Sequence, residues 1–318
     1  MSTLNIVMAQ INPLVGDIDG NKELVLASTI RAMEQFEANI VVFPELTLTG
    51  YPPEDLLLRP SLQKRIDTAL NDLLQAKLDC YIVVGYPKRD AGGLFNMAGV
   101  IYRGELICEY AKHCLPNYQV FDEKRYFTPG FELPTFMING NRIGLSICED
   151  IWEGATLQQL KQAKLDLLLN LNGSPFHQNK QAIREALVQK RTSEIGAPII
   201  YVNQVGGQDE LVFDGGSMAW NAPTKNNESD GKSAQLVSRS PLFEEHLNPV
   251  IFDGISKSLK AYALSSKTAI VDTEGTLATI YKALVLGVKD YVNKNGFKGV
   301  VLGLSGGIDS ALTLAVAS

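Results

Sequence analysis

The stretch Arg142–Trp152, RIGLSICEDIW, decides the fold class. Its apolar residues up to Ile147 predict a buried strand, and Cys148 follows where that strand meets a turn or a short helix. This junction would expose the thiol as a nucleophile, and backbone N–H groups around it would lower the thiol pKa and hold an oxyanion. The alternative is a small core residue, the usual role of a lone cysteine at a strand end. Other strand ends must decide between the two.

Two further apolar segments end in charged residues. Ile40–Phe43 runs into Pro44 and Glu45, and the strand predicted over 106–114 carries Lys112 near its end. Charged residues are rarely buried behind apolar strands without a function. A carboxylate, an ammonium group and a thiol together can supply a base, oxyanion stabilisation and a nucleophile. The three strand ends therefore favour a catalytic cysteine.

Histidine does not fit such a site. The chain has three histidines, and His113 follows Lys112 in a strand, where neighbouring side chains point to opposite faces. His177 lies in a predicted loop and His246 in a predicted linker, so both favour surface roles. A triad built on histidine is not predicted.

The C-terminal stretch 299–318, GVVLGLSGGIDSALTLAVAS, predicts a buried strand, a glycine-rich turn and the beginning of a helix. The turn from Ser305 to Ser310 offers backbone N–H groups and two hydroxyls at a helix N-terminus, which suits a pyrophosphate. A Walker A loop is excluded because its Lys-Ser/Thr ending is missing.

Strand-like and helix-like segments alternate along the rest of the chain, which indicates a mixed α/β fold. We expect a first domain over 1–240. Residues 241–272 show weak periodicity and are interpreted as a surface linker, and a helical pattern over 273–295 opens a second domain, 273–318.

The three strand ends resemble the Glu-Lys-Cys triad of the nitrilase (carbon–nitrogen hydrolase) superfamily. The resemblance implies a four-layer αββα sandwich in which Glu45 is the general base, Lys112 stabilises the tetrahedral intermediate and Cys148 attacks the carbonyl. The backbone N–H of Glu149 would be a second oxyanion donor. Glu123 resembles a supporting glutamate of the family, although a surface charge is an equal alternative.

The turn at 305–310 resembles the SGGxDS loop of the ATP-pyrophosphatase (adenylating) family, so the tail would be the truncated start of a Rossmann-like adenylating domain. A nitrilase-like domain followed by this loop resembles the glutamine-dependent NAD synthetase family. The supporting strings are FPELTLTGYPPEDLL (43–57), KHCLPNYQVFDEKRYF (112–127), ICEDIW (147–152) and NLNGSPFH (170–177). The resemblance implies that glutamine is cut to glutamate and ammonia, which then amidates deamido-NAD to NAD at the expense of ATP.

The resemblance also implies binding residues. The glutamine pocket would contain Tyr118, Glu149, Trp152, Ser174 and Lys180, with Glu149 on the α-ammonium and Ser174 and Lys180 on the α-carboxylate. Tyr118 has an equal alternative as a half-buried aromatic. The ATP pyrophosphate would meet Ser305, Gly306, Gly307, Asp309 and Ser310, with Asp309 acting through Mg²⁺. Glutamine hydrolysis itself would need no cofactor.

Two other functions stay open: a stand-alone nitrilase-type amidase or carbamoylase, and a non-catalytic nucleotide-binding scaffold. Because little sequence follows the SGGIDS turn, we expect the 318-residue chain to lack synthetase activity. A net charge of −6 without a dense Lys/Arg stripe argues against a nucleic-acid partner. No apolar run is long enough to span a membrane. Four scattered cysteines fit reduced thiols in the cytoplasm, and a homo-oligomer is expected.

Overall fold

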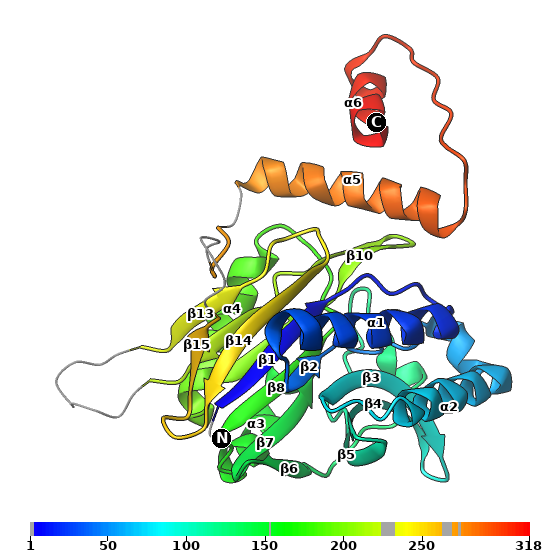
Figure 1. Cartoon of the computed structure of the whole chain (residues 1–318). Helices are drawn as coiled ribbons and strands as arrows, with labels where there is room; N and C mark the ends of the chain where they lie inside the picture. Colours follow the sequence, from blue (N-terminus) through cyan, green and yellow to red (C-terminus); the bar gives the residue numbers. More distant parts are fainter. Residues whose placement is uncertain (1–2, 153, 224–232, 263–268, 273–274) are drawn as a thin grey trace.

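Two β-sheets packed face to face form the centre of the molecule (Figure 1). The computed structural model describes residues 3–152, 154–223, 233–262, 269–272 and 275–318. Apolar residues from both sheets, such as Ile6, Val42, Leu145 and Leu169, make one buried cluster between them. This double-sheet core fixes where every strand end of the site can lie.

The larger sheet has seven strands in the order β15-β14-β1-β2-β3-β4-β5. Strands β1, β2 and β3 are parallel, and β3-β4-β5 form an antiparallel meander. The bounds are β1 Thr3–Gln10, β2 Ile40–Val42, β3 Tyr81–Asp90, β4 Gly93–Tyr102, β5 Glu105–Ala111, β14 His246–Asp253 and β15 Ser258–Ala261.

The smaller sheet has six strands in the order β13-β12-β9-β8-β7-β6, and β10 with β11 makes a separate hairpin. Strands β7, β8 and β9 are parallel, and their apolar runs are buried on both faces. The bounds are β6 Thr135–Ile138, β7 Asn141–Ile147, β8 Leu167–Asn172, β9 Ile199–Asn203, β10 Val205–Gln208, β11 Leu211–Asp214, β12 Met218–Asn221 and β13 Gln235–Arg239.

Helices cover the outer face of each sheet. Helices α1 (Ile18–Phe36) and α2 (Pro60–Gln75) pack on the seven-stranded sheet, and α3 (Gly154–Gln162) and α4 (Lys180–Ile195) pack on the six-stranded sheet. Short 3₁₀ turns lie at η1 Glu54–Leu58, η2 Glu123–Arg125 and η3 Cys148–Ile151. The predicted αββα sandwich is confirmed. None of the helices in the described part of the chain has the length and apolarity to cross a bilayer.

The expected surface linker over 241–272 is wrong for the part that the structure describes, because β14 pairs with β1 inside the larger sheet. The strand alternates as a strand should, but one of its inward positions is Asn248, which bonds Ser238 and Ser240. Pro249, which argues against a central strand, pairs with Val7. A polar inward residue and a proline therefore conceal the period of two. The domain boundaries themselves stay predictions.

Helix α5 (Thr276–Lys294) confirms the helical pattern predicted at 273–295 and lies across the β10–β11 hairpin (Figure 1). Asp290 of α5 is buried and accepts hydrogen bonds from Gly207 N and Asn12 Nδ2, both at 2.7 Å. A Cβ on Gly207 would lie 3.0 Å from the Cα of Gly287, so this contact requires a small residue. Lys294 Nζ donates to Gly207 O at 2.9 Å. We call these five residues the α5 joint.

The strand predicted at 299–304 is wrong. These residues have no regular structure, and Val301 is fully exposed. A strand needs a neighbour to bond, and the described residues offer none beside this segment. Helix α6 (Ile308–Ala317) follows and lies beyond α5, away from the sheets (Figure 1).

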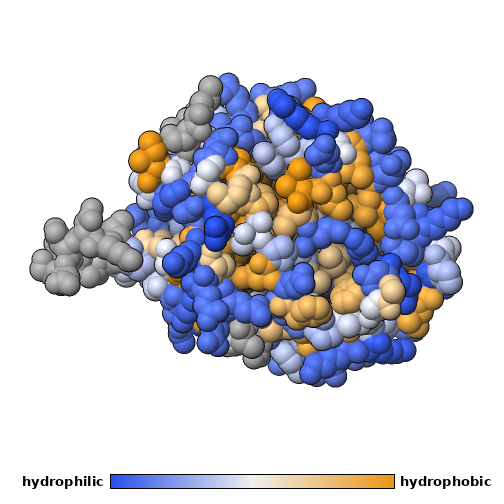
Figure 2. Space-filling model, turned by 90° about the horizontal axis from the view of Figure 1, so that it is seen from below, coloured by the Kyte–Doolittle hydropathy of each residue, from blue (hydrophilic) through white to orange (hydrophobic). Residues whose placement is uncertain are grey.

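The opposite side of the molecule, away from α5, has an ordinary surface. Hydrophilic residues predominate there, with apolar residues gathered in several patches (Figure 2).

Candidate active site

The ends of three strands converge at one edge of the double sheet. Glu45 follows β2, Lys112 follows β5 and Cys148 follows β7. Two antiparallel pairings separate β3 from β5, so β5 runs in the same direction as β2 and β3. The carboxyl ends of β2 and β5 therefore point to the same edge, and Glu45 and Lys112 meet although 66 residues separate them in sequence.

Lys112 lies between two buried carboxylates. Its Nζ is 2.7 Å from Glu45 Oε1 and 2.7 Å from Glu123 Oε1. Lys112 and Glu45 are fully buried, and Glu123 is 6% exposed, so Glu123 is not a surface charge. This is a dry charge cluster, and such clusters are costly unless every member is paired.

Burial sets the protonation of the cluster. It lowers the pKa of Lys112, but the negative charges of Glu123 and Glu45 outweigh this and hold that pKa well above 10.5. Burial, assisted by the charge of Glu45 and opposed by Lys112, raises the pKa of Glu123 to about 7. Lys112 is therefore a permanent cation, whereas Glu123 titrates near neutrality.

Cys148 opens the 3₁₀ turn η3 with a backbone φ of +43°, a left-handed conformation that a non-glycine residue rarely adopts. This strained strand-to-turn junction agrees with the predicted geometry. The thiol is 4% exposed, however, and burial together with Glu45 raises its pKa well above 9.0, although Lys112 acts in the opposite direction. The expectation of an exposed thiol with a lowered pKa is therefore wrong, because desolvation outweighs the nearby cation.

Several partners of the charge cluster were missed from sequence. Asn96 Nδ2 donates to Glu45 Oε1 at 2.8 Å, and the backbone N–H of Gly173 donates to Glu45 Oε2 at 3.0 Å. Tyr51 donates to Glu123 Oε1 at 3.2 Å. An inward-facing Asn in the otherwise apolar strand β4 is the signal that could have identified Asn96.

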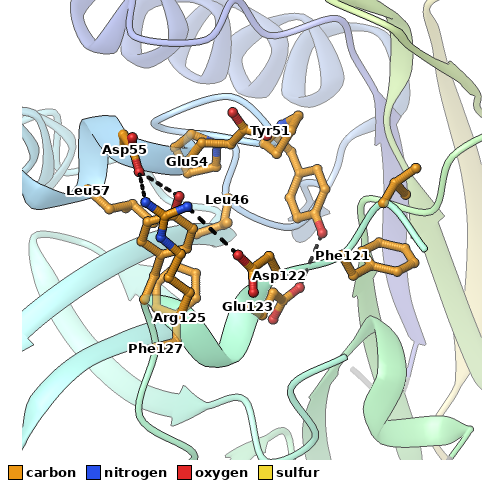
Figure 3. A pocket seen from close by; sticks show the side chains of 14 residues that line it. Leu46, Tyr51, Glu54, Asp55, Leu57, Phe121, Asp122, Glu123, Arg125 and Phe127 are labelled. Carbon is orange, nitrogen blue, oxygen red and sulfur yellow. Dashed lines mark hydrogen bonds and ion pairs between the residues drawn. The ribbon is translucent and has the colours of Figure 1, made fainter. Parts of the chain in front are cut away.

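A cavity of about 160 Å³ lies on the Glu123 side of the cluster (Figure 3). Tyr51 and Glu123 contribute to its wall, and so does Arg125, which pairs with Asp55 and Asp122. Cys148 is not among the lining residues. The cavity therefore adjoins the carboxyl group that titrates near neutrality, and the thiol takes no part in its wall.

The residues predicted to bind glutamine form two contacting pairs. The Tyr118 hydroxyl donates to both carboxylate oxygens of Glu149, at 2.9 and 3.1 Å, and Tyr118 is half exposed. The ammonium of Lys180 lies 4.6 Å from the centre of the Trp152 ring. Burial and the nearby charge of Arg184 lower the pKa of Lys180, and the carboxylate of Glu149 acts in the opposite direction.

The fifth predicted residue, Ser174, is held by a buried arginine that sequence reasoning missed. Arg184 Nε donates to Ser174 Oγ at 3.1 Å, and Arg184 Nη2 donates to Ser174 O at 2.7 Å. Nη1 of the same guanidinium donates to both carboxylate oxygens of Asp214, at 2.8 and 2.9 Å. The signal was an arginine on the face of α4 that also carries buried Val188, where an apolar residue is expected.

The predicted phosphate loop is exposed and lies apart from the charge cluster. Ser305 Oγ and Ser310 Oγ are 3.1 Å apart, Gly306 has a φ of +83° and Gly307 caps the N-terminus of α6. Backbone N–H groups at a helix N-terminus suit a phosphate, and the exposed Asp309 beside them suits Mg²⁺. Across the described ranges, no group of three or more His, Cys, Asp or Glu could itself hold a metal.

Two family models match the chain. The carbon-nitrogen hydrolase model matches residues 6–224, and the NAD synthase model matches residues 280–318. Among curated proteins, the glutamine-dependent NAD(+) synthetase of Acinetobacter baylyi is 41% identical over 319 residues, which is 100% of this chain and 56% of the relative. That of Aquifex aeolicus is 39% identical over 99% of this chain and 58% of the relative. The chain thus spans a little over half the length of these relatives.

Solved structures give the same pattern. Glutamine-dependent NAD+ synthetase from Acinetobacter baumannii, solved with ADP, matches with a TM-score of 0.88 and 41% identity, covering 99% of this chain and 57% of that one. A nitrilase-superfamily amidase from Nesterenkonia matches with a TM-score of 0.67 and 23% identity, covering 80% of this chain and 92% of that one. At that identity, the amidase shares the fold.

Proposed function

Because the chain belongs to the carbon-nitrogen hydrolase family, we propose that it hydrolyses the side-chain amide of glutamine to glutamate and ammonia. The observation that carries the proposal is the dry cluster of Glu45, Lys112 and Glu123, in whose electric field the Cys148 thiol lies. A buried ammonium group between two carboxylates is expensive for a protein to keep, and catalysis explains its presence.

The chemistry proceeds in two halves. Glu45 takes the proton of Cys148 as the sulfur attacks the amide carbon, and the resulting oxyanion is stabilised by Lys112 and the backbone N–H of Glu149. The protonated Glu45 then gives its proton to the leaving nitrogen, and the C–N bond breaks to release ammonia and leave a thioester. Water, deprotonated by Glu45, attacks the thioester and releases glutamate with the thiol restored.

The raised thiol pKa fits this sequence. A thiol with a high pKa is protonated at rest, so it needs a base at the moment of attack rather than a standing thiolate. Glu45 is prepared for this role because Asn96 and Gly173 fix both of its oxygens. Glu123 takes no proton from substrate in this scheme and instead helps to hold Lys112 in place.

Glutamine is recognised by its two α-groups. Glu149, oriented by Tyr118, binds the α-ammonium. Lys180, above the Trp152 ring, and Ser174, fixed by Arg184, bind the α-carboxylate. Glu149 acts on Lys180 from nearby, but among the described residues no ion pair within 4.0 Å joins Lys180 to a carboxylate, so a substrate carboxylate would be its direct partner.

The likeness to NAD synthetases supports a second proposal. In a protein of the relatives' full length, the ammonia released here would amidate deamido-NAD to NAD, and ATP would be consumed. In it, Ser305, Gly306, Gly307, Asp309 and Ser310 would hold the ATP pyrophosphate, with Mg²⁺ at Asp309 supplying charge neutralisation. The NAD synthase model over 280–318 and the exposed helix N-terminus of α6 support this assignment. A cytoplasmic location and a homo-oligomeric state stay predictions.

The test is a glutaminase assay on the wild-type chain and on Cys148→Ala. Ammonia release from glutamine should disappear in the variant while its far-UV circular dichroism is retained, because an alanine cannot form the thioester. A glutamine-derived chloroketone should add one label, at Cys148, by mass spectrometry. Cys80 and Cys108 serve as internal controls: burial raises their thiol pKa values too, to about 12 and about 11, but Glu45 is not among the groups that act on them. Faster hydrolysis of acetamide than of glutamine would instead identify a simple amidase.

A further inference from the structure

One buried carboxylate near the site takes no part in the proposed chemistry. Asp150 is fully buried and lies two residues after Cys148. Its Oδ2 accepts hydrogen bonds from Ile147 N at 2.9 Å and from the Tyr110 hydroxyl at 2.7 Å. Its Oδ1 accepts from His113 N at 3.0 Å and from Cys114 N at 2.8 Å.

These four donors come from strand β7 of one sheet and from strand β5 of the other with the segment that follows it. Ile147 is the last residue of β7 and immediately precedes Cys148, whereas Tyr110 belongs to β5 and His113 immediately follows Lys112. The Asp150 carboxylate therefore ties the turn that carries the thiol to the strand end that carries the ammonium group. All four contacts are donations to its oxygens, so both oxygens act as acceptors, as those of an ionised carboxylate do.

We propose that Asp150 is a positioning residue for amide hydrolysis: it fixes the distance between Cys148 and Lys112 across the inter-sheet gap. This inference rests on the proposed function, because it gives Asp150 its importance through the thiol and the ammonium group. No other side chain in the described residues bonds the backbone on both sides of that gap directly beside Cys148 and Lys112.

The strain at Cys148 explains why such a tie is needed. A φ of +43° is unfavourable for a non-glycine residue and persists only where the surroundings hold it. Asp150 bonds the N–H of Ile147, on one side of the strained residue, from its own place on the other side. Without this bond the turn can relax, and a misplacement of about 1 Å is enough to cost about 100-fold in rate.

The decisive variant is Asp150→Asn, which keeps the size but replaces one accepting oxygen with an NH₂ group that faces donors. We expect kcat for glutamine to fall about 100-fold and KM to change much less, because Lys180 and Ser174, which bind the α-carboxylate in the proposed site, lie outside the turn that carries Cys148. The matched control is Asp166→Asn. Asp166 Oδ2 accepts from Arg142 N at 2.8 Å at the opposite end of the same strand β7, and this variant should keep wild-type kcat.

A second readout distinguishes a thiol that is misplaced relative to Glu45 and Lys112 from a thiol that has become open to solvent. The rate at which iodoacetamide alkylates Cys148, followed by mass spectrometry, should fall at least about tenfold in Asp150→Asn, because the thiol is then poorly placed toward its base and its cation. If the variant instead opened the site to solvent, the buried thiol would become accessible and iodoacetamide would alkylate it faster. This measurement needs no glutamine, so it remains informative if wild type fails to hydrolyse glutamine and the proposed function is wrong.

If Asp150→Asn does not fold by circular dichroism, Tyr110→Phe decides. It removes one donor and keeps the charge, and we expect kcat about tenfold lower with KM unchanged, since a hydrogen bond to a charged group contributes about 1.5 kcal/mol. The proposal is overturned by wild-type kcat in a folded Asp150→Asn, by faster Cys148 alkylation, or by an equal loss in Asp166→Asn. If Asp150→Asn does not fold, the proposal is overturned by an unchanged kcat in Tyr110→Phe.

Discussion

At the residue scale, the site depends on one lysine that two carboxylates share. Lys112 bonds Glu45 and Glu123 at the same distance, but the two carboxylates differ in their other partners. Glu45 is bonded at both oxygens, whereas Glu123 has one oxygen, Oε2, for which the described residues offer no hydrogen-bond partner. Glu123 is the carboxylate of the pair that titrates near neutrality, and Glu45, with both oxygens held, is placed to act as the base.

The adjacent residues Lys112 and His113 provide a direct test of the oxyanion role. Lys112→Ala should lower kcat for glutamine by about 10³-fold, because removing an oxyanion donor costs 10²–10³ and the buried carboxylates lose their cation as well. The His113 ring contacts Glu132 O at 3.0 Å and packs on Tyr110, and neither contact reaches the charge cluster, so His113→Ala should keep kcat within about threefold. Steady-state kinetics on both variants measures this. Equal losses would mean that the imidazole, not the ammonium group, acts on the substrate.

Glu123 makes stability depend on pH in a direction that can be stated. Its pKa is about 7 in the folded protein, above the ordinary value of 4.5, so the fold favours the protonated form. The contribution of Glu123 to the free energy of unfolding is fully present below pH 4.5 and is lost as the pH rises to about 7. Glu123→Gln mimics the protonated group and lacks this loss.

The free energy of unfolding of wild type, minus that of Glu123→Gln, should therefore fall by up to about 3 kcal/mol between pH 4.5 and pH 7.5. Urea titrations at several pH values measure the difference, which cancels the other titrating groups. A difference that rises with pH would show that Glu123 is stabilised as a carboxylate instead.

At the element scale, sequence reasoning succeeds where the pattern is local and fails where distant partners decide. Apolar runs identify β2 and β7, and the charged residues that follow them point to the site. Arg184 was missed because its role comes from hydrogen bonds to Asp214 and Ser174, which lie in other parts of the sequence. The buried state of Cys148 was missed because sequence spacing carries no information on the desolvation that two packed sheets impose.

The α5 joint is another long-range contact, and Asp290 is its centre. Asp290→Ala leaves Gly207 N and Asn12 Nδ2 without their acceptor, which should cost about 2 kcal/mol of local stability. Amide hydrogen exchange in 276–294 should then quicken about 30-fold, while exposed Lys289→Ala on the same helix should leave it unchanged. Unchanged exchange in Asp290→Ala would mean that apolar contacts alone hold α5.

At the scale of the whole molecule, the two matched families occupy regions of different character. The hydrolase region has a closed double-sheet core, whereas the glycine-rich loop near α6 is exposed and makes few contacts. Hydrogen-bond donors stabilise a transition state only when a rigid framework holds them in advance. Among the residues that the structure describes, no sheet packs against the loop to supply that framework.

We therefore expect the 318-residue chain to release ammonia from glutamine but to form no NAD from deamido-NAD, ATP and Mg²⁺. Free ammonium chloride should not restore NAD formation, because the defect lies in the adenylating half rather than in the ammonia supply. Chromatographic detection of NAD measures the result. NAD formation from ammonium chloride would show that the exposed loop is sufficient.

Because the Cys148 thiol is protonated and buried, it also affects how long the protein keeps its activity when no substrate is present. Peroxide oxidises accessible thiolates and spares buried neutral thiols, and Cys148 is 4% exposed with a raised pKa. The resting protein is thus shielded from sulfenic acid formation without a partner cysteine to repair it. In the proposed sequence Glu45 takes the proton only as the sulfur bonds to the substrate carbon, so no free thiolate is offered to an oxidant, and the resting protein should keep its activity in dilute peroxide.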